Sequence, residues 1–167
     1  KKTVDLCSGS GAIAVALDKI SGAKVTAVEI DETAFSYLET NVKENNSSVK
    51  SVMADALEIC ETFADGELDL IVSNPPYIKS ADIETLQKEV RLEPRLALDG
   101  GEDGCDFYRE IVSRWSRKLK KGGALAFELG ENQADAVKAL MTEQGFSDFK
   151  ISLDFGGVQR AIIGTLL

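Results

Sequence analysis

Residues 2–11 decide the fold, and they read Lys-Thr-Val-Asp-Leu-Cys-Ser-Gly-Ser-Gly. The apolar run that ends at Leu6 predicts a short strand, and the segment Cys7 to Gly11 predicts a tight turn that opens a helix. Gly9 and Gly11 let the backbone approach a ligand where a Cβ would intrude, and the next helix begins with free N–H groups. This turn therefore predicts a binding site for a polar or anionic group.

The alternation of strand and helix continues to the C-terminus. Apolar periodicity predicts helices between the strands. The apolar face of the first helix is expected at Ile13, Ala16, Leu17 and Ile20. This order predicts an α/β fold with a mostly parallel seven-stranded sheet, helices on both faces and an antiparallel C-terminal hairpin. The predicted strands cover residues 2–6, 25–30, 49–53, 68–73, 124–129, 149–155 and 161–166.

Length and composition exclude several classes of protein. The chain of 167 residues predicts one domain, residues 1–167, and its 44% apolar and 28% charged residues are typical of a globular protein. The longest uncharged run, Leu6 to Leu17, is too short to span a membrane. A net charge of −9 disfavours stable binding to nucleic acid. Since the chain contains no histidine, His-activated nucleophiles and His-ligated metals are excluded.

Cysteine usage and the chain start suggest a compartment and a context. Cys7, Cys60 and Cys105 are widely spaced and odd in number, which fits neither a zinc site nor a disulfide framework and favours the reducing cytoplasm. The chain enters a strand directly after Lys1, with no targeting segment. We therefore expect a domain taken from a longer protein.

An acidic residue at the end of the second predicted strand extends the site. Glu29 lies 20 residues after Gly9, where a carboxylate accepts ribose hydroxyls in dinucleotide-binding folds. These features fit either a nicotinamide dinucleotide or S-adenosylmethionine, because both present an adenosine ribose. Asp5 favours S-adenosylmethionine, since a carboxylate attracts the methionine ammonium and repels a pyrophosphate. Asp55, after the third predicted strand, is a candidate for the adenine amino group.

The segment Asn74-Pro75-Pro76-Tyr77 follows the fourth predicted strand and indicates the chemistry. The prolines cannot extend a sheet, so they fix a rigid exit that points the Asn74 carboxamide and the Pro75 carbonyl into the cleft, beside Tyr77. An amide or amino nitrogen is a poor nucleophile until two carbonyl acceptors hold its N–H groups in the transition state. In-line methyl transfer from a sulfonium then needs neither a histidine nor a metal.

Together these segments resemble the class I S-adenosylmethionine-dependent methyltransferases with an NPPY motif. More narrowly, they resemble the HemK/PrmC group of protein-(glutamine-N5) methyltransferases, which act on peptide-chain release factors. The resemblance covers nearly the whole chain and is most specific at 93–98, Glu-Pro-Arg-Leu-Ala-Leu, at 100–104, Gly-Gly-Glu-Asp-Gly, and at 106–109, Asp-Phe-Tyr-Arg. It implies a Rossmann-like class I fold, S-adenosylmethionine without a metal, and a loop from Glu93 to Gly104 that shapes the pocket.

This sequence also differs from the family pattern in two respects. The N-terminal helical domain that helps to seat the release factor is absent from these residues. Cys7 stands where glycine is common, which is acceptable if its φ is negative.

The expected function follows from the resemblance and the motifs. We expect a cytoplasmic enzyme that transfers a methyl group from S-adenosylmethionine to the side-chain amide nitrogen of a release-factor glutamine, without stable binding to nucleic acid or membrane. The alternatives are a DNA or RNA amino-methyltransferase, acting on adenine N6 or guanine N2, and a non-catalytic nucleotide-binding Rossmann module. The candidate catalytic residues are Asn74, Pro75, Pro76 and Tyr77. The candidate cofactor-binding residues are Asp5, Cys7, Ser8, Gly9, Ser10, Gly11, Glu29, Asp55, Ala56 and Asn74. Replacing Glu29 by alanine is expected to weaken cofactor binding and to leave folding almost unchanged.

Overall fold

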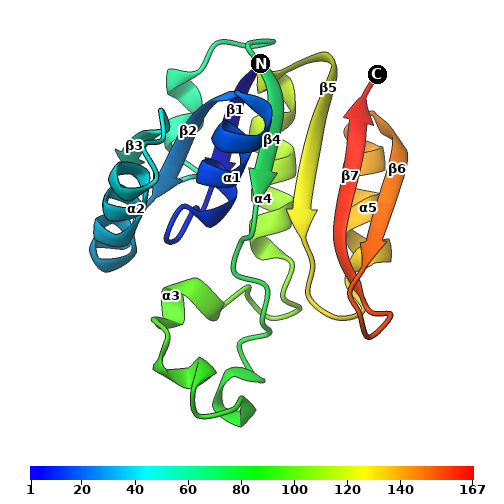
Figure 1. Cartoon of the computed structure of the whole chain (residues 1–167). Coiled ribbons are helices and arrows are strands. Elements are labelled where there is room, and N and C mark those ends of the chain that lie inside the picture. Colours follow the sequence, from blue (N-terminus) through cyan, green and yellow to red (C-terminus); the bar gives the residue numbers. More distant parts are fainter.

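The computed structural model describes residues 1–167 and contains one sheet of seven strands flanked by helices (Figure 1). The strands are β1 (Lys2–Leu6), β2 (Lys24–Glu29), β3 (Lys50–Met53), β4 (Leu68–Ser73), β5 (Leu119–Glu128), β6 (Phe146–Leu153) and β7 (Gln159–Leu166). Their order in the sheet is β3-β2-β1-β4-β5-β7-β6. The first five pair in parallel, and β7 is antiparallel to both β5 and β6. The predicted sheet with its antiparallel C-terminal hairpin is therefore confirmed.

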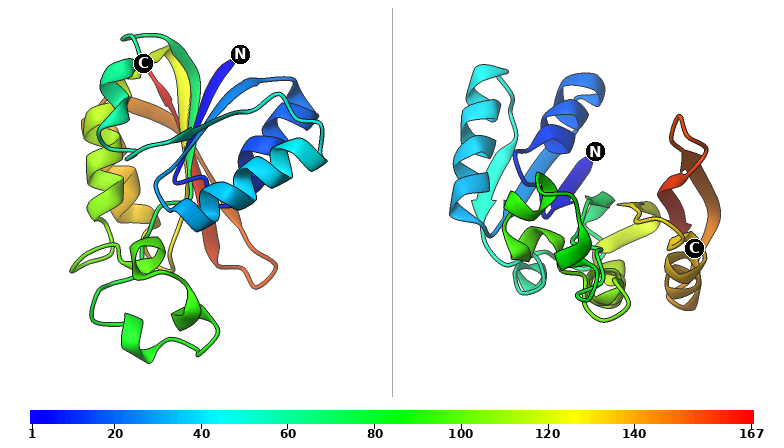
Figure 2. Two further views of the ribbon diagram at one scale, coloured as in Figure 1. Left: turned by 90° about the vertical axis from the view of Figure 1, so that its left-hand side faces the viewer. Right: turned by 90° about the horizontal axis from the view of Figure 1, so that it is seen from below.

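Helices cover both faces of this sheet, as Figures 1 and 2 show. The helices are α1 (Ala12–Ser21), α2 (Glu32–Glu44), α3 (Arg95–Leu98), α4 (Asp106–Trp115) and α5 (Ala134–Glu143), with short 3₁₀ helices at η1 (Ile59–Thr62), η2 (Ile83–Thr85), η3 (Val90–Leu92) and η4 (Ser116–Lys118). None has the length and apolar character that crossing a membrane requires.

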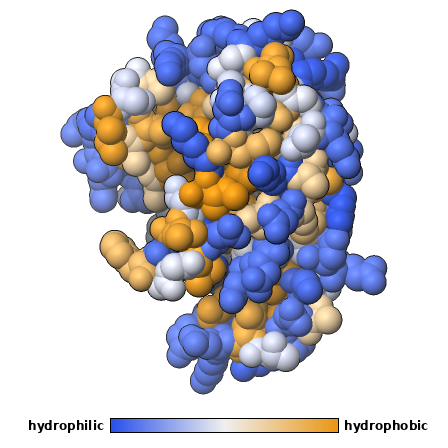
Figure 3. Space-filling view, turned by 90° about the vertical axis from the view of Figure 1, so that its right-hand side faces the viewer, coloured by the Kyte–Doolittle hydropathy of each residue, from blue (hydrophilic) through white to orange (hydrophobic).

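The two faces of the sheet differ in how completely they are covered. The larger core lies under α4 and α5 and contains the buried Trp115 and Phe127. A smaller core lies under α1 and α2 and contains Ala14 and Leu38. On that second face no helix lies in front of β4, β5 and β7 (Figure 1). The pairing register places partly exposed apolar residues there, namely Leu70, Val72, Ala124, Ala126 and Ile163. Figure 3, viewed from the β6–β7 side, shows apolar side chains gathered near the centre of the surface.

The predicted inner face of α1 is only partly correct, because Leu17 packs against the smaller core whereas Ala16 and Ile20 are exposed. Ala14 is fully buried, whereas Ile20 is 86% exposed. Ala16 and Ile20 lie along a shallow apolar groove on the surface of α1. Because residues 12–17 are all apolar, periodicity cannot select the buried face. The small side chain of Ala14 allows the helix to approach the sheet closely.

The predicted start of β5 is also too late. The strand begins at Leu119 instead of at residue 124, so the Gly122-Gly123 pair lies within the strand. A register shift against β4 between Leu68 and Leu70 accommodates these residues. A glycine pair is thus compatible with a strand irregularity as well as with a turn.

The strand order places a crevice at the carboxyl ends of β1, β2 and β4. The chain passes from β1 outward to β2 and β3, and then returns to the other side of β1 with β4. Ligands of open α/β sheets bind where the strand order reverses in this way.

Candidate active site

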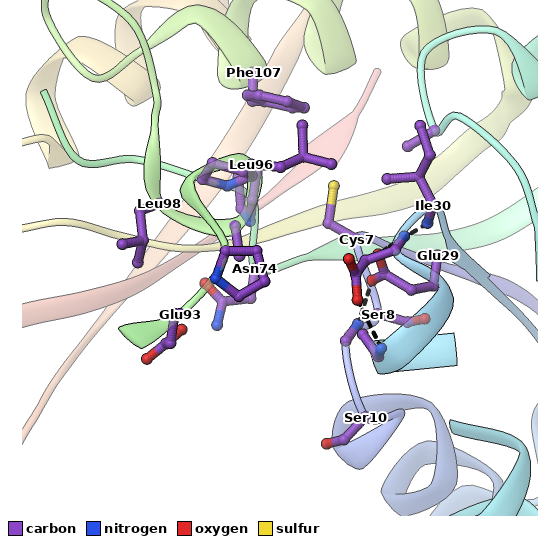
Figure 4. Close-up of a pocket in the computed structure, with 18 of the residues that line it drawn as sticks. Cys7, Ser8, Ser10, Glu29, Ile30, Asn74, Glu93, Leu96, Leu98 and Phe107 are labelled. Carbon is purple, nitrogen blue, oxygen red and sulfur yellow. Dashed lines mark hydrogen bonds between the residues drawn. The ribbon is translucent and has the colours of Figure 1, made fainter. Parts of the chain in front are cut away.

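A cavity of about 920 Å³ opens at these strand ends. Figure 4 shows Cys7, Ser8 and Glu29 on one side of it, and Asn74, Glu93 and Leu96 on the other. All candidate site residues predicted from the sequence line the cavity except Asp5 and Gly11. The glycine turn, Glu29 and the Asn74–Tyr77 segment are thus brought together, although they are far apart in the sequence.

The turn after β1 is held by Glu29. The Ser8 N–H donates to the Val28 carbonyl at 3.0 Å, which continues the pairing of β1 with β2. Glu29 Oε2 accepts the Gly9 N–H at 2.7 Å. Its Oε1 accepts the N–H groups of Ile30 and Asp31 at 2.8 and 2.9 Å. Oε2 accepts only one N–H group and keeps acceptor capacity, so this side chain can still receive a ribose hydroxyl.

Cys7 does not meet the condition under which a cysteine would be acceptable at this position. Its φ is +55°, in the left-handed region that favours glycine, and not negative. Burial and the nearby Glu29 carboxylate raise the pKa of the Cys7 thiol to about 12. The thiol therefore stays protonated at neutral pH and lines the cavity as a small apolar group.

Asp5 and Gly11 lie outside the cavity wall. The Asp5 side chain is completely buried and both its oxygens lack a hydrogen-bond partner. Burial raises its pKa to about 7, and the Glu29 charge adds to the increase. Gly11 caps α1 with a φ of 80°, and a Cβ there would collide with Leu38 of α2. Gly11 is thus required by helix packing, and the predicted cofactor contacts of both residues stay predictions.

The Asn74–Tyr77 segment forms the opposite wall. Ser73, the last residue of β4, is buried and donates its hydroxyl to the Leu6 carbonyl at 2.8 Å. Asn74 is exposed on the cavity, while Pro75 and Pro76 are buried. The half-buried Tyr77 donates its hydroxyl to Glu128 Oε1 at 3.4 Å, and burial together with the Glu128 charge raises the pKa of Tyr77. Tyr77 therefore remains protonated and provides a wall for the site.

The cavity has a single sign of charge. Its ionisable carboxylates are Glu29, Asp31, Asp55 and Glu93, and no lysine or arginine lines it. In addition, Ser8 lines the cavity, and its buried Oγ has no hydrogen-bond partner in the chain. Carboxylates around a pocket favour a cationic ligand over a pyrophosphate. A polar group of such a ligand would also satisfy Ser8.

Sequence reasoning missed part of the lining. Thr33, Ala34 and Tyr37 of α2 face the cavity at helical spacing. This spacing could have identified them once Glu29 was assigned to the site. The exposed Leu92 and Leu96, on the loop after the tetrapeptide, also line the cavity. The resemblance had pointed to the loop from Glu93 to Gly104, which contains Leu96 but not Leu92.

Comparison with known proteins gives a family and named relatives. The family model described as methyltransferase small domain matches residues 1–96. A release factor glutamine methyltransferase of Geobacter sulfurreducens is 42% identical, over 98% of this chain and 57% of its own length. One of Clostridium acetobutylicum is 37% identical, over 98% of this chain and 58% of its own length. The chain thus spans little more than half the length of these curated relatives.

Solved structures share the fold at lower identity. A methyltransferase from Pyrococcus furiosus superimposes with a TM-score of 0.74 and 24% identity, covering 98% of this chain and 73% of its own. The hMettl16 catalytic domain, in complex with a MAT2A 3′UTR hairpin, gives a TM-score of 0.74 and 17% identity, covering 100% of this chain and 64% of its own. At these identities the likeness concerns the fold.

The strand order, the strand-end cavity and these neighbours define a class I methyltransferase fold, as the sequence predicted. The chain belongs to the methyltransferase small domain family.

Proposed function

We propose that this chain is the catalytic part of a protein-glutamine N5-methyltransferase, which uses S-adenosylmethionine and acts on a peptide-chain release factor in the cytoplasm. The observation that carries the proposal is that one cavity joins the Asn74–Tyr77 segment to the glycine turn and Glu29. The names of the relatives from Geobacter sulfurreducens and Clostridium acetobutylicum support the substrate.

The glycine-turn side of the cavity fits the cofactor. Backbone and side-chain groups of Cys7 to Ser10 would surround its methionine part, with the unpartnered Ser8 Oγ as one ligand. Glu29 would accept ribose hydroxyls, and Asp55 with Ala56 would meet the adenine. When bound, the cofactor supplies a methyl group on a positively charged sulfur. Four carboxylates and no basic side chain around the cavity suit that charge.

The side of the cavity formed by Asn74–Tyr77 fits the glutamine side chain of the substrate. The Asn74 carboxamide oxygen and the Pro75 carbonyl would accept the two N–H groups of the substrate amide. These hydrogen bonds would strengthen in the transition state, as the nitrogen loses conjugation. Tyr77 would pack against the amide plane. When the N–C bond forms, the methyl–sulfur bond would break with its electron pair left on sulfur, and the nitrogen would release one proton. Because Asn74 is exposed, that proton would have a route to water.

The charge of the cavity argues against the alternatives. A dinucleotide would place its pyrophosphate among carboxylates, and a nucleic-acid substrate would bring phosphates to a chain of net charge −9. Neither alternative is favoured by a contact in the structure.

Two measurements test the proposal. Calorimetry should show binding of S-adenosylhomocysteine and none of NAD. Mass spectrometry of a release factor incubated with the protein and S-adenosylmethionine should show one added methyl group on a glutamine-containing peptide. Methylation of nucleic acid with an unmodified release factor would contradict the proposed substrate.

A further inference from the structure

A buried group of hydrogen bonds centred on Gln133 ties separate segments together. Gln133, the residue before α5, is only 8% exposed. Its amide nitrogen donates to the carbonyls of Tyr77 at 2.9 Å and Gly104 at 3.2 Å. Its amide oxygen accepts the Gly130 N–H at 2.9 Å and lies 3.3 Å from the Tyr108 hydroxyl. These five residues are called the Gln133 cluster below. The donors and the acceptor of the amide are all used, which also fixes its orientation.

The backbone approaches this amide closely enough to require glycine at two positions. A Cβ on Gly104 would lie 2.5 Å from the Tyr77 carbonyl oxygen and 2.6 Å from Gln133 Nε2. A Cβ on Gly130 would lie 2.5 Å from Gln133 Oε1. All three distances are shorter than real Cβ atoms show, so the cluster depends on a glutamine with these glycine partners.

The cluster sits at the base of the loop formed by residues 79–98. The two ends of this loop are paired, since the Ile78 N–H donates to the Leu98 carbonyl at 2.9 Å and the Gly100 N–H donates to the Ile78 carbonyl at 2.8 Å. Figure 1 shows the loop, with α3, projecting beyond the strand ends. Residues 90–98 of it line the cavity except Arg91 and Arg95. Gln133 joins this paired base to the segment between β5 and α5.

The side chain of Gln133 is not used to cap its own helix. α5 begins after Gln133 without a side-chain hydrogen bond at the cap. The amide instead reaches the Tyr77 and Gly104 carbonyls, which lie 56 and 29 residues away in the chain. Its contacts therefore serve the loop base and the tetrapeptide.

We propose that Gln133 is a positioning residue for methyl transfer. It holds the Tyr77 carbonyl and the base of loop 79–98, and so sets the separation of the loop and Asn74 across the cavity. Gln133 does not line the cavity and acts through Tyr77. Because the proline rings restrict φ at Pro75 and Pro76, a displacement at Tyr77 is transmitted to Asn74. This inference rests on the proposed function.

The main test replaces Gln133 by methionine, which keeps the length of the side chain and removes both donors. The variant should bind S-adenosylhomocysteine with nearly the parent affinity, because its contacts lie away from the glycine turn. Its kcat/KM for the release factor should fall by about 10- to 100-fold, the cost expected of a misplaced reacting group. Ser116→Ala is the control, because Ser116 is also buried and donates to a backbone carbonyl, that of Val112 in α4. This control should keep the parent kcat/KM.

A second variant, Gln133→Glu, gives a pH signature. Its carboxylate would face the Tyr77 and Gly104 carbonyls and repel them, whereas a protonated carboxyl group can donate to one of them. Burial raises the pKa of such a carboxyl group. The ratio of the variant's activity to the parent's should therefore increase as the pH is lowered from about 8.5 to about 6. A ratio that is constant over this range would overturn the proposal.

Hydrogen exchange separates this inference from the proposed function. The Ile78 and Gly100 amides should exchange faster in Gln133→Met than in the parent or in Ser116→Ala. If the parent methylates no release factor, the proposed function fails, and the exchange rates still test the cluster. If the parent is active and Gln133→Met keeps both its kcat/KM and its exchange rates, the inference fails. If Gln133→Met does not fold, the pH dependence of the activity of Gln133→Glu relative to the parent tests the inference.

Discussion

Glu29 uses both carboxylate oxygens within the chain, before any ligand is bound. It accepts the N–H groups of Gly9, Ile30 and Asp31, and so holds the glycine turn against the start of α2. The sequence alone suggested that its replacement would spare the fold. The structure changes that expectation, because removal of the carboxylate leaves part-buried N–H groups without their acceptor.

Glu29→Gln should therefore weaken cofactor binding and lower the thermal midpoint together. The glutamine keeps one acceptor oxygen, but its NH₂ group faces N–H donors, and each charge-assisted bond lost costs about 1.5–3 kcal/mol. Calorimetry with S-adenosylhomocysteine should show affinity reduced about tenfold or more. Glu32→Gln, an exposed change in the first turn of α2, is the matched control. Unchanged affinity in Glu29→Gln would remove Glu29 from the site.

Asn74 is the residue at which binding and chemistry separate. Asn74→Ala should keep the thermal midpoint and bind S-adenosylhomocysteine within about tenfold, because its proposed contact strengthens only in the transition state. Methyl transfer should fall by on the order of a hundredfold to a thousandfold. Asn74→Asp should retain partial activity, since a carboxylate also accepts N–H groups. Steady-state kinetics showing the parent rate in both variants would make Asn74 a turn residue only.

At the scale of an element, loop 79–98 presents apolar side chains to solvent at the rim of the cavity. Leu92 is 79% exposed and Leu96 is 53% exposed, although both line the cavity. Exposed apolar residues at the rim of a site are typical of contacts with a partner. The loop is therefore suited to meet the protein that carries the target glutamine.

Replacing Leu92 and Leu96 together by serine should weaken recognition of the release factor. The KM for the release factor should rise about tenfold, the effect of losing two partly buried apolar contacts. Affinity for S-adenosylhomocysteine and the thermal midpoint should hardly change, because these side chains contribute little to the core. Phe155→Ser, a change at a still more exposed apolar residue in the turn between β6 and β7, should leave the KM unaltered. A loop variant with the parent KM would show that the substrate does not use this rim.

At the scale of the whole molecule, two aspartates give stability opposite dependences on pH. Asp5 is buried, and its pKa is raised from 3.8 to about 7. Asp18 accepts hydrogen bonds from Ser47 and Ser48, which lower its pKa from 3.8 to about 2. Between pH 3.8 and about 7 the folded chain keeps the Asp5 proton that the unfolded chain releases, so stability falls as pH rises. For Asp18, stability is lost as pH falls from 3.8 towards 2.

Asp5→Asn should stabilise the protein at pH above 7, because the amide avoids the cost of a buried charge. From the direction and size of the shift we expect a gain on the order of 2–4 kcal/mol there, decreasing towards zero near pH 4. Asp18→Asn should instead lower stability at neutral pH and have no effect near pH 2. Urea unfolding across this range measures both changes. If Asp5→Asn destabilises the protein at high pH, the Asp5 carboxylate makes a favourable contact when charged.

The sequence by itself determined the fold class, the seven strands and most of the site, because those features depend on local patterns. Glycine spacing, the strand that ends at Ser73 and the segment Asn74–Tyr77 are all readable within a few residues. Only the tertiary structure decided features that depend on contacts between distant segments. It selected Ala14 as the buried residue of α1, whose first six residues are all apolar, and it buried Asp5 away from the cavity. It also surrounded Gln133 with the carbonyls of Tyr77 and Gly104. No local pattern encodes such contacts, because the partners are brought together only when the sheet and the loop base have formed.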